Sequence, residues 1–75
     1  MSSDAQSVSR RLLKEEIERI VAKAKAKGEV LATGRCGASL FVAYPEANIP
    51  VDRIVDLLTL AASAQGVAVR LERPH

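Results

Sequence analysis

The sequence predicts a single helix-dominated α+β domain, and three observations lead to this fold class. Apolar residues recur at helical spacing over residues 7–27 and again over about residues 50–64. Residues 67–72 alternate between apolar and polar side chains, which is typical of a half-buried strand. The chain has 75 residues, of which 48% are hydrophobic and 27% charged, so it is too apolar for a disordered chain. We therefore expect one small domain over residues 7–72, with a disordered N-terminus at residues 1–6 and a tail at residues 73–75.

The N-terminal segment is expected to form a long amphipathic helix that ends at Lys27. Candidate N-caps are Asp4, Ser7 and Ser9, because their side-chain oxygens can accept hydrogen bonds from the first turn. Gly28 stands where a glycine commonly follows the last helical residue. One stripe of this helix is apolar and should face the core: Leu13, Ile17, Ile20, Val21 and Ala24, with Leu12 beside it.

Residues 29–44 are compatible with two structures. In the first, a short strand at residues 30–32 leads into a helix over residues 33–44, with Thr33 as its N-cap. In the second, residues 29–44 form a β-hairpin that turns at Cys36 and Gly37, giving an α-β-β-α-β order and a three-stranded sheet. Pro45 ends the element in either case.

A series of short motifs runs through residues 30–72. The motifs are Thr33-Gly34-Arg35, Leu40, Tyr44-Pro45, Ile54, Leu58, Ala62 and Gly66-Val67-Ala68-Val69. In this arrangement the chain resembles short uncharacterised bacterial proteins. The resemblance implies a helix before Tyr44-Pro45, and it implies no particular function.

The helix over about residues 50–64 has more apolar surface than one core-facing stripe requires. Leu57 and Leu60 lie outside that stripe, and residues 57–64 contain no charged residue. A helix of this kind is central in a core or is shared with a partner. The following strand, residues 67–72, needs a pairing partner, which is either the segment at residues 30–32 or the same strand of a second copy.

Several chemistries are excluded or disfavoured by composition. Cys36 and His75 each occur once, so neither a disulfide nor a zinc site with paired ligands is expected. Arg35 would favour a reactive Cys36 thiolate, but with no histidine nearby we interpret Cys36 as a small half-buried apolar residue. Gly34 and Gly37 alone do not make a nucleotide-binding loop. We expect no catalytic residue, cofactor or metal.

The apolar segments and the single cysteine also predict where the protein is located. No stretch of about 18 apolar residues indicates a membrane span. The N-terminal segment lacks the apolar core of a secretory signal, and the single cysteine suits a reducing compartment, so the cytoplasm is the expected location.

The sequence therefore predicts a small non-enzymatic protein-interaction module, in the form of a homodimer or a complex with another protein. The predicted interface lies on the apolar helix and the C-terminal strand and consists of Leu57, Leu58, Leu60, Val67, Val69 and Leu71.

An alternative is a small nucleic-acid-binding regulator with a helix-turn-helix-like arrangement of residues 33–64. Its phosphate contacts would be Arg10, Arg11, Lys14, Lys23 and Lys27. The net charge is only +2, and acidic residues are interspersed among these basic ones, which weakens the attraction for phosphate.

Overall fold

The computed structural model describes residues 2–70, with side chains described from Gln6 onward. The elements are α1 (Ser2–Lys27), β1 (Leu31–Ala32), α2 (Thr33–Ala43), the 3₁₀ turn η1 (Pro45–Ala47), α3 (Val51–Gln65) and β2 (Val69–Arg70). The predicted helix-dominated α+β class is confirmed, and the segment before Tyr44 is a helix. The β-hairpin alternative is therefore wrong.

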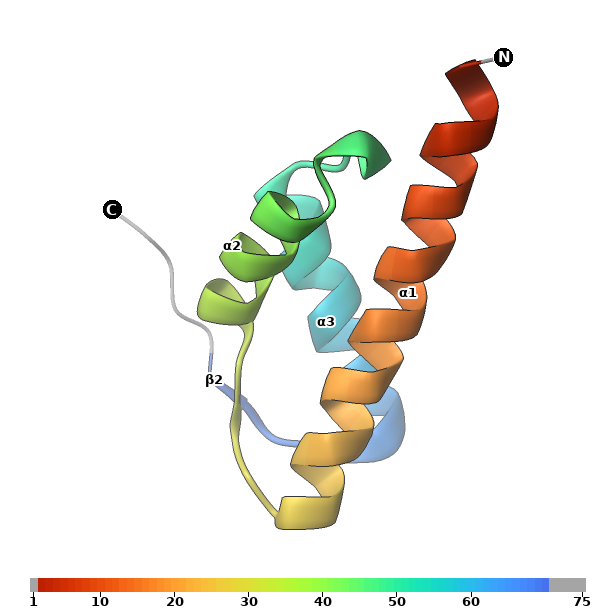
Figure 1. The fold of residues 1–75 in the computed structure, drawn as a ribbon. Helices are drawn as coiled ribbons and strands as arrows, with labels where there is room; N and C mark the ends of the chain where they lie inside the picture. Colours follow the sequence, from red (N-terminus) through yellow and green to blue (C-terminus); the bar gives the residue numbers. More distant parts are fainter. Residues whose placement is uncertain (1, 71–75) are drawn as a thin grey trace.

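Helix α1 runs along one side of the molecule, and its first turns extend beyond the other elements (Figure 1). It begins at Ser2, so residues 2–6 are helical and the predicted N-caps lie inside the helix rather than at its start. No glycine or proline precedes Gly28, so the sequence contains nothing that would end the helix earlier. Gly28 ends it as predicted, with a φ of 65° that suits glycine.

Helix α2 packs closely against α3 because Gly37 has no side chain. A Cβ atom at Gly37 would lie 2.7 Å from Cγ2 of Val55, closer than real Cβ contacts. A packing requirement thus accounts for this glycine.

Thr33 is not the N-cap of α2, contrary to the prediction from the sequence. The N-cap is Ala32, which makes no side-chain capping hydrogen bond. Thr33 is wholly buried, and its hydroxyl donates instead to the carbonyl oxygen of Arg70 at 3.1 Å.

The two short strands pair in parallel and bring the two ends of the α2–α3 unit together. Leu31 lies opposite Val69, and Ala32 lies opposite Arg70. The pairing of the C-terminal strand with residues 30–32 is thereby confirmed. The strand begins later than predicted, because the Val67 N–H donates to Ala62 and completes the end of α3 instead. The predicted strand residues 71 and 72 lie outside the described residues.

The core lies where α1, α3 and η1 meet, and α2 packs on α3 and contributes Leu40 to it. Most of the stripe predicted for α1 is buried there, whereas Ile20 is only partly buried and Leu12 is exposed. The buried apolar residues are Leu13, Ile17, Val21, Ala24, Leu31, Leu40, Ala47, Ile54, Leu58, Ala62 and Val67.

Candidate interaction surface

Helix α3 has an inner side in the core and an outer apolar side. Ile54, Leu58 and Ala62 recur every fourth residue and are buried. Leu57 is half-buried, and Leu60 is 68% exposed. A spacing of three residues places Leu57 and Leu60 on neighbouring parts of one side. We call Leu57, Leu60 and Ala64 the outer stripe of α3.

Two of the predicted interface residues belong to the core of this chain. Leu58 is 0% exposed and Val67 is 8% exposed, so neither side chain is accessible to a partner. Leu58 follows Ile54 by one turn and shares its inward direction, and Val67 packs inward once Gly66 has ended the helix. Val69 is half-buried against the core, and Leu71 lies outside the described residues. Among the described residues of the predicted interface, Leu60 is largely exposed, and Leu57 and Val69 are each partly accessible.

A groove of about 320 Å³ lies between α1 and α3, next to the outer stripe. Its lining is mostly apolar, and the partly buried Ile49, Leu57 and Ala61 supply most of the accessible apolar surface. The lining residues are Arg10, Leu13, Lys14, Ile17, Glu18, Ile49, Leu57 and Ala61.

The rim of this groove is basic. Arg10 and Lys14 line it from α1, and Arg53 lines an adjoining hollow that shares Arg10 and Leu57. The Arg10 Nε–H donates to the carbonyl oxygen of Ala47 at 3.1 Å, which holds the guanidinium beside the groove. Glu18 is the one acidic residue in the lining of the groove.

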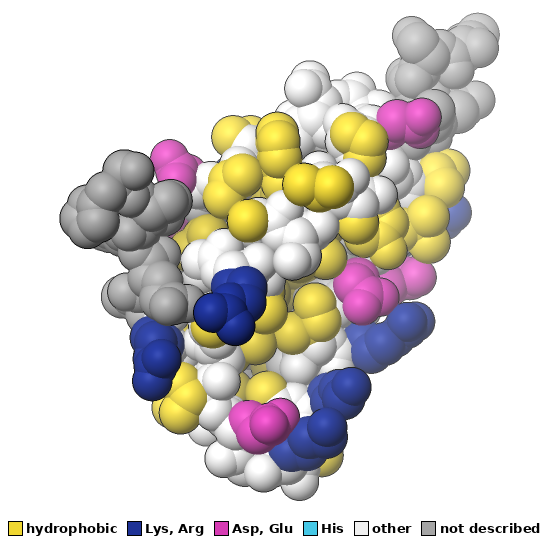
Figure 2. Space-filling model, turned by 60° about the vertical axis from the view of Figure 1, so that its left-hand side comes forward, with side chains coloured by type: hydrophobic (Ala, Val, Ile, Leu, Met, Phe, Trp, Pro, Cys, Tyr) yellow, Lys and Arg dark blue, Asp and Glu magenta, His cyan; other side chains and the backbone are white. Residues whose placement is uncertain are grey.

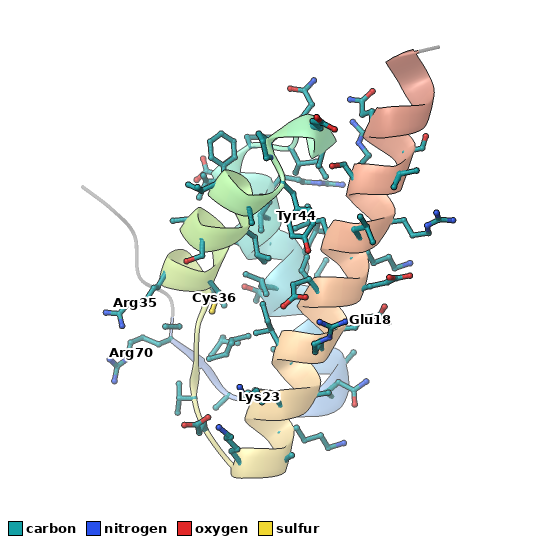
Figure 3. The ribbon with its side chains drawn as sticks, viewed as in Figure 1. Glu18, Lys23, Arg35, Cys36, Tyr44 and Arg70 are labelled. Carbon is teal, nitrogen blue, oxygen red and sulfur yellow. The ribbon has the colours of Figure 1, made fainter. Side chains whose placement is uncertain are left out.

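A second hollow, of about 510 Å³, lies between α1 and α2 and contains Cys36. Cys36 and Tyr44 lie on the side of α2 and its following turn that faces α1, whereas Arg35 points away from α1 (Figure 3). Burial raises the pKa of the Cys36 thiol, and the nearby Arg35 charge opposes this only in part. Desolvation therefore favours the protonated thiol, the less nucleophilic form.

Exposed apolar side chains also occur on α2, where Val42 is 77% exposed and Phe41 is partly exposed. In Figure 2, hydrophobic side chains gather on the upper part of the face that carries α2, and lysines and arginines lie lower. Phe41 and Val42 line neither the groove between α1 and α3 nor the hollow that contains Cys36.

The five basic residues of the nucleic-acid alternative do not gather at one place. Arg10 and Lys14 line the groove near the start of α3, whereas Lys23 and Lys27 belong to the last turns of α1. Helices α2 and α3 do pack in succession, as the alternative requires. However, α3 exposes Asp52 and Asp56, which would repel phosphate.

Within residues 2–70, no helix is long and apolar enough to cross a membrane. The same residues contain no group of three or more histidine, cysteine, aspartate or glutamate side chains that could hold a metal ion.

No protein-family model, curated protein or solved structure matches the chain. The resemblance to short bacterial proteins therefore stays a prediction, and the function has to be inferred from the surface itself.

Proposed function

We propose that this protein is a small non-enzymatic interaction module that associates with a second copy through the outer stripe of α3. The observation that carries the proposal is Leu60, which is 68% exposed within a stretch of residues that bears no charge. Fully burying a leucine side chain stabilises a structure or complex by about 1.5–3 kcal/mol. Leu57, half-buried one turn earlier, extends the surface that would be buried.

The pattern of the outer stripe suits a symmetric partner. Leu57, Leu60 and Ala64 follow one another at intervals of three and four residues, the spacing at which side chains of two helices interdigitate. A surface without charge can meet its own copy without repulsion between like charges, as a twofold contact requires. Val69 lies in β2, where it pairs with Leu31, so the proposal rests on α3 alone.

Sedimentation equilibrium over a range of protein concentrations tests this proposal. We expect a concentration-dependent dimer, and we expect Leu60→Lys to shift the equilibrium towards monomer. The exposed position of Leu60 means that this substitution leaves the fold intact, which circular dichroism can verify. Val42→Lys is the matched control, because Val42 is 77% exposed but lies on α2.

Two results would contradict self-association through α3. One is a monomer at every concentration. The other is a dimer that persists in Leu60→Lys, which would move the interface to another surface such as the Val42 patch.

A further inference from the structure

We propose that the groove between α1 and α3 binds an acidic amphipathic helix of a partner protein. The inference rests on the proposed function, because it uses the same side of α3, and it adds the chemistry of a second partner. Three features carry it: the apolar floor of the groove, its basic rim and the fixed position of Arg10.

The floor of the groove can receive apolar side chains. Ile49, Leu57 and Ala61 supply the accessible apolar surface of the groove, and the almost wholly buried side chains of Leu13 and Ile17 lie beneath it. A volume of about 320 Å³ accommodates a few leucine-sized side chains but not a whole helix. This suits recognition in which a helix lies over a groove and inserts residues at i, i+3 or i+4, and i+7.

The rim selects for negative charge. Arg10, Lys14 and Arg53 border the groove and its adjoining hollow, against Glu18 alone. Glutamates that flank the apolar stripe of a bound helix would pair with these cations, since arginine and lysine form charge-assisted hydrogen bonds with carboxylates. A second copy docking through α3 would bring the exposed Asp56, which lies one turn before Leu60, whereas a bound helix can place glutamates along both sides of its apolar stripe.

Arg10 is already in position before any partner binds. Its Nε–H donates to the Ala47 carbonyl at 3.1 Å, across 37 positions of the sequence. A side chain held in this way loses less conformational freedom on binding than a free one, which favours affinity.

The two proposed partners compete for one surface. Leu57 belongs both to the wall of the groove and to the outer stripe that a second copy would cover. An acidic helix in the groove should therefore dissociate the dimer.

Fluorescence anisotropy with designed peptides tests this inference on the full chain. The acidic probe carries leucine at helical spacing with alanine and glutamate elsewhere, and the basic probe replaces each glutamate with lysine. We expect the acidic probe to bind, more tightly at low than at high salt, and the basic probe to bind at least tenfold more weakly. In sedimentation, saturating acidic probe should replace the dimer with a one-to-one complex.

Charge-reversal variants locate the binding site. We expect Lys14→Glu and Arg53→Glu each to weaken binding of the acidic probe about fivefold, the upper range for one exposed charge pair. Lys23→Glu makes the same change in net charge on α1 away from the groove, and it should leave binding unchanged. Ala61→Gln fills the groove without changing charge and should abolish binding, with the helical signal as the check on folding.

Equal binding of the two probes, no binding of either, or an equal effect of Lys23→Glu and Lys14→Glu would overturn the inference. If a dimer still forms without any probe binding, the proposed function stands and only the acidic partner is wrong. If the chain is a monomer that binds neither probe, both are wrong. A further control is a single-stranded oligonucleotide that binds the wild type at low salt but fails to bind both Lys14→Glu and Lys23→Glu. That result would replace the dimer and the acidic partner with the nucleic-acid alternative.

Discussion

At the scale of single residues, Thr33 shows how a side chain expected at a helix cap acts in tertiary structure instead. It is wholly buried, and its hydroxyl joins the first residue of α2 to the carbonyl of Arg70 in β2. This bond connects segments 37 positions apart and holds the two strands at the base of the α2–α3 unit.

Replacing Thr33 with valine should therefore lower the free energy of unfolding by about 1–2 kcal/mol. Valine keeps the shape but leaves the Arg70 carbonyl without this donor, and the loss of a partly buried hydrogen bond costs about that much. Denaturant unfolding measures the change. Thr59→Val is the matched control, because the Thr59 hydroxyl donates to Val55 in its own helix at 2.8 Å. Equal losses in the two variants would contradict the role given to Thr33.

Cys36 should make the protein less stable at alkaline pH. Burial raises the pKa of its thiol in the folded state above its ordinary value. The folded state therefore holds this proton more tightly than the unfolded state. Its contribution to stability is present below the ordinary thiol pKa of about 8.5 and is lost as pH rises through the folded-state pKa.

The wild-type chain should thus lose more stability than Cys36→Ser between about pH 7 and pH 10, a range that spans the ordinary thiol pKa. Urea unfolding at both pH values, under reducing conditions, gives the difference. The two proteins differ only at residue 36, so the difference between their pH dependences reports on the thiol. A parallel pH dependence in the two proteins would show that the thiol is not desolvated.

At the scale of elements, the close approach of α2 and α3 depends on Gly37. Its Cα faces the side chain of Val55, and there is no room between them for a methyl group. A glycine inside a helix costs about 1 kcal/mol relative to alanine. The close packing of α2 on α3 offsets this cost, because a larger residue at position 37 would push the two helices apart.

Gly37→Ala should destabilise the protein by about 1 kcal/mol, since overpacking costs about 1–3 kcal/mol and the gain in helix propensity offsets part of it. In a Val55→Ala background the same substitution should become stabilising, because the clashing Cγ2 atom is gone. Thermal or denaturant unfolding of the four proteins in this cycle tests the coupling. An unchanged sign in the Val55→Ala background would show that the helices do not meet at this point.

At the scale of the whole molecule, two helices and a short parallel strand pair form a unit that α1 covers from one side (Figure 1). The core is small, and Leu60 remains outside it. A small domain buries a limited share of its surface, so association through such a residue adds stability that the monomer lacks.

If the proposed dimer forms, thermal stability should rise with protein concentration, because association favours the folded state by mass action. Leu60→Lys should remove this concentration dependence while it leaves the melting temperature at high dilution close to that of the wild type. Scanning calorimetry over a wide concentration range measures both. A melting temperature of the wild type that does not change with concentration would contradict the dimer.

Much of the fold was predictable because it depends on local patterns. The period of Leu13, Ile17, Val21 and Ala24 indicates the buried side of α1, and Gly28 indicates where α1 ends. The structure agrees at each of these places. The start of α1 was placed too late, since caps were inferred from serines that the helix continues through.

The interaction surface was only partly predictable. Leu57 and Leu60 were recognised as apolar residues outside the main stripe, but Leu58 and Val67 were assigned to the interface and belong to the core. The hydrophobic period shows which side of a helix faces the core. It does not show how much of the helix surface the neighbouring elements bury. The groove was missed altogether, because Arg10 and Arg53 come together only when α1 lies along α3.

The sequence by itself determined α1 and α3, the C-terminal end of α1 and the helix-dominated class, because hydrophobic period, glycine and proline act within a few residues. Only the tertiary structure decided between helix and hairpin for residues 33–43, paired β1 with β2, and placed a basic rim beside an apolar groove. These features depend on contacts between residues far apart in the chain, such as Thr33 with Arg70 and Arg10 with Ala47. Local sequence patterns do not indicate such contacts, which form only when the helices pack together.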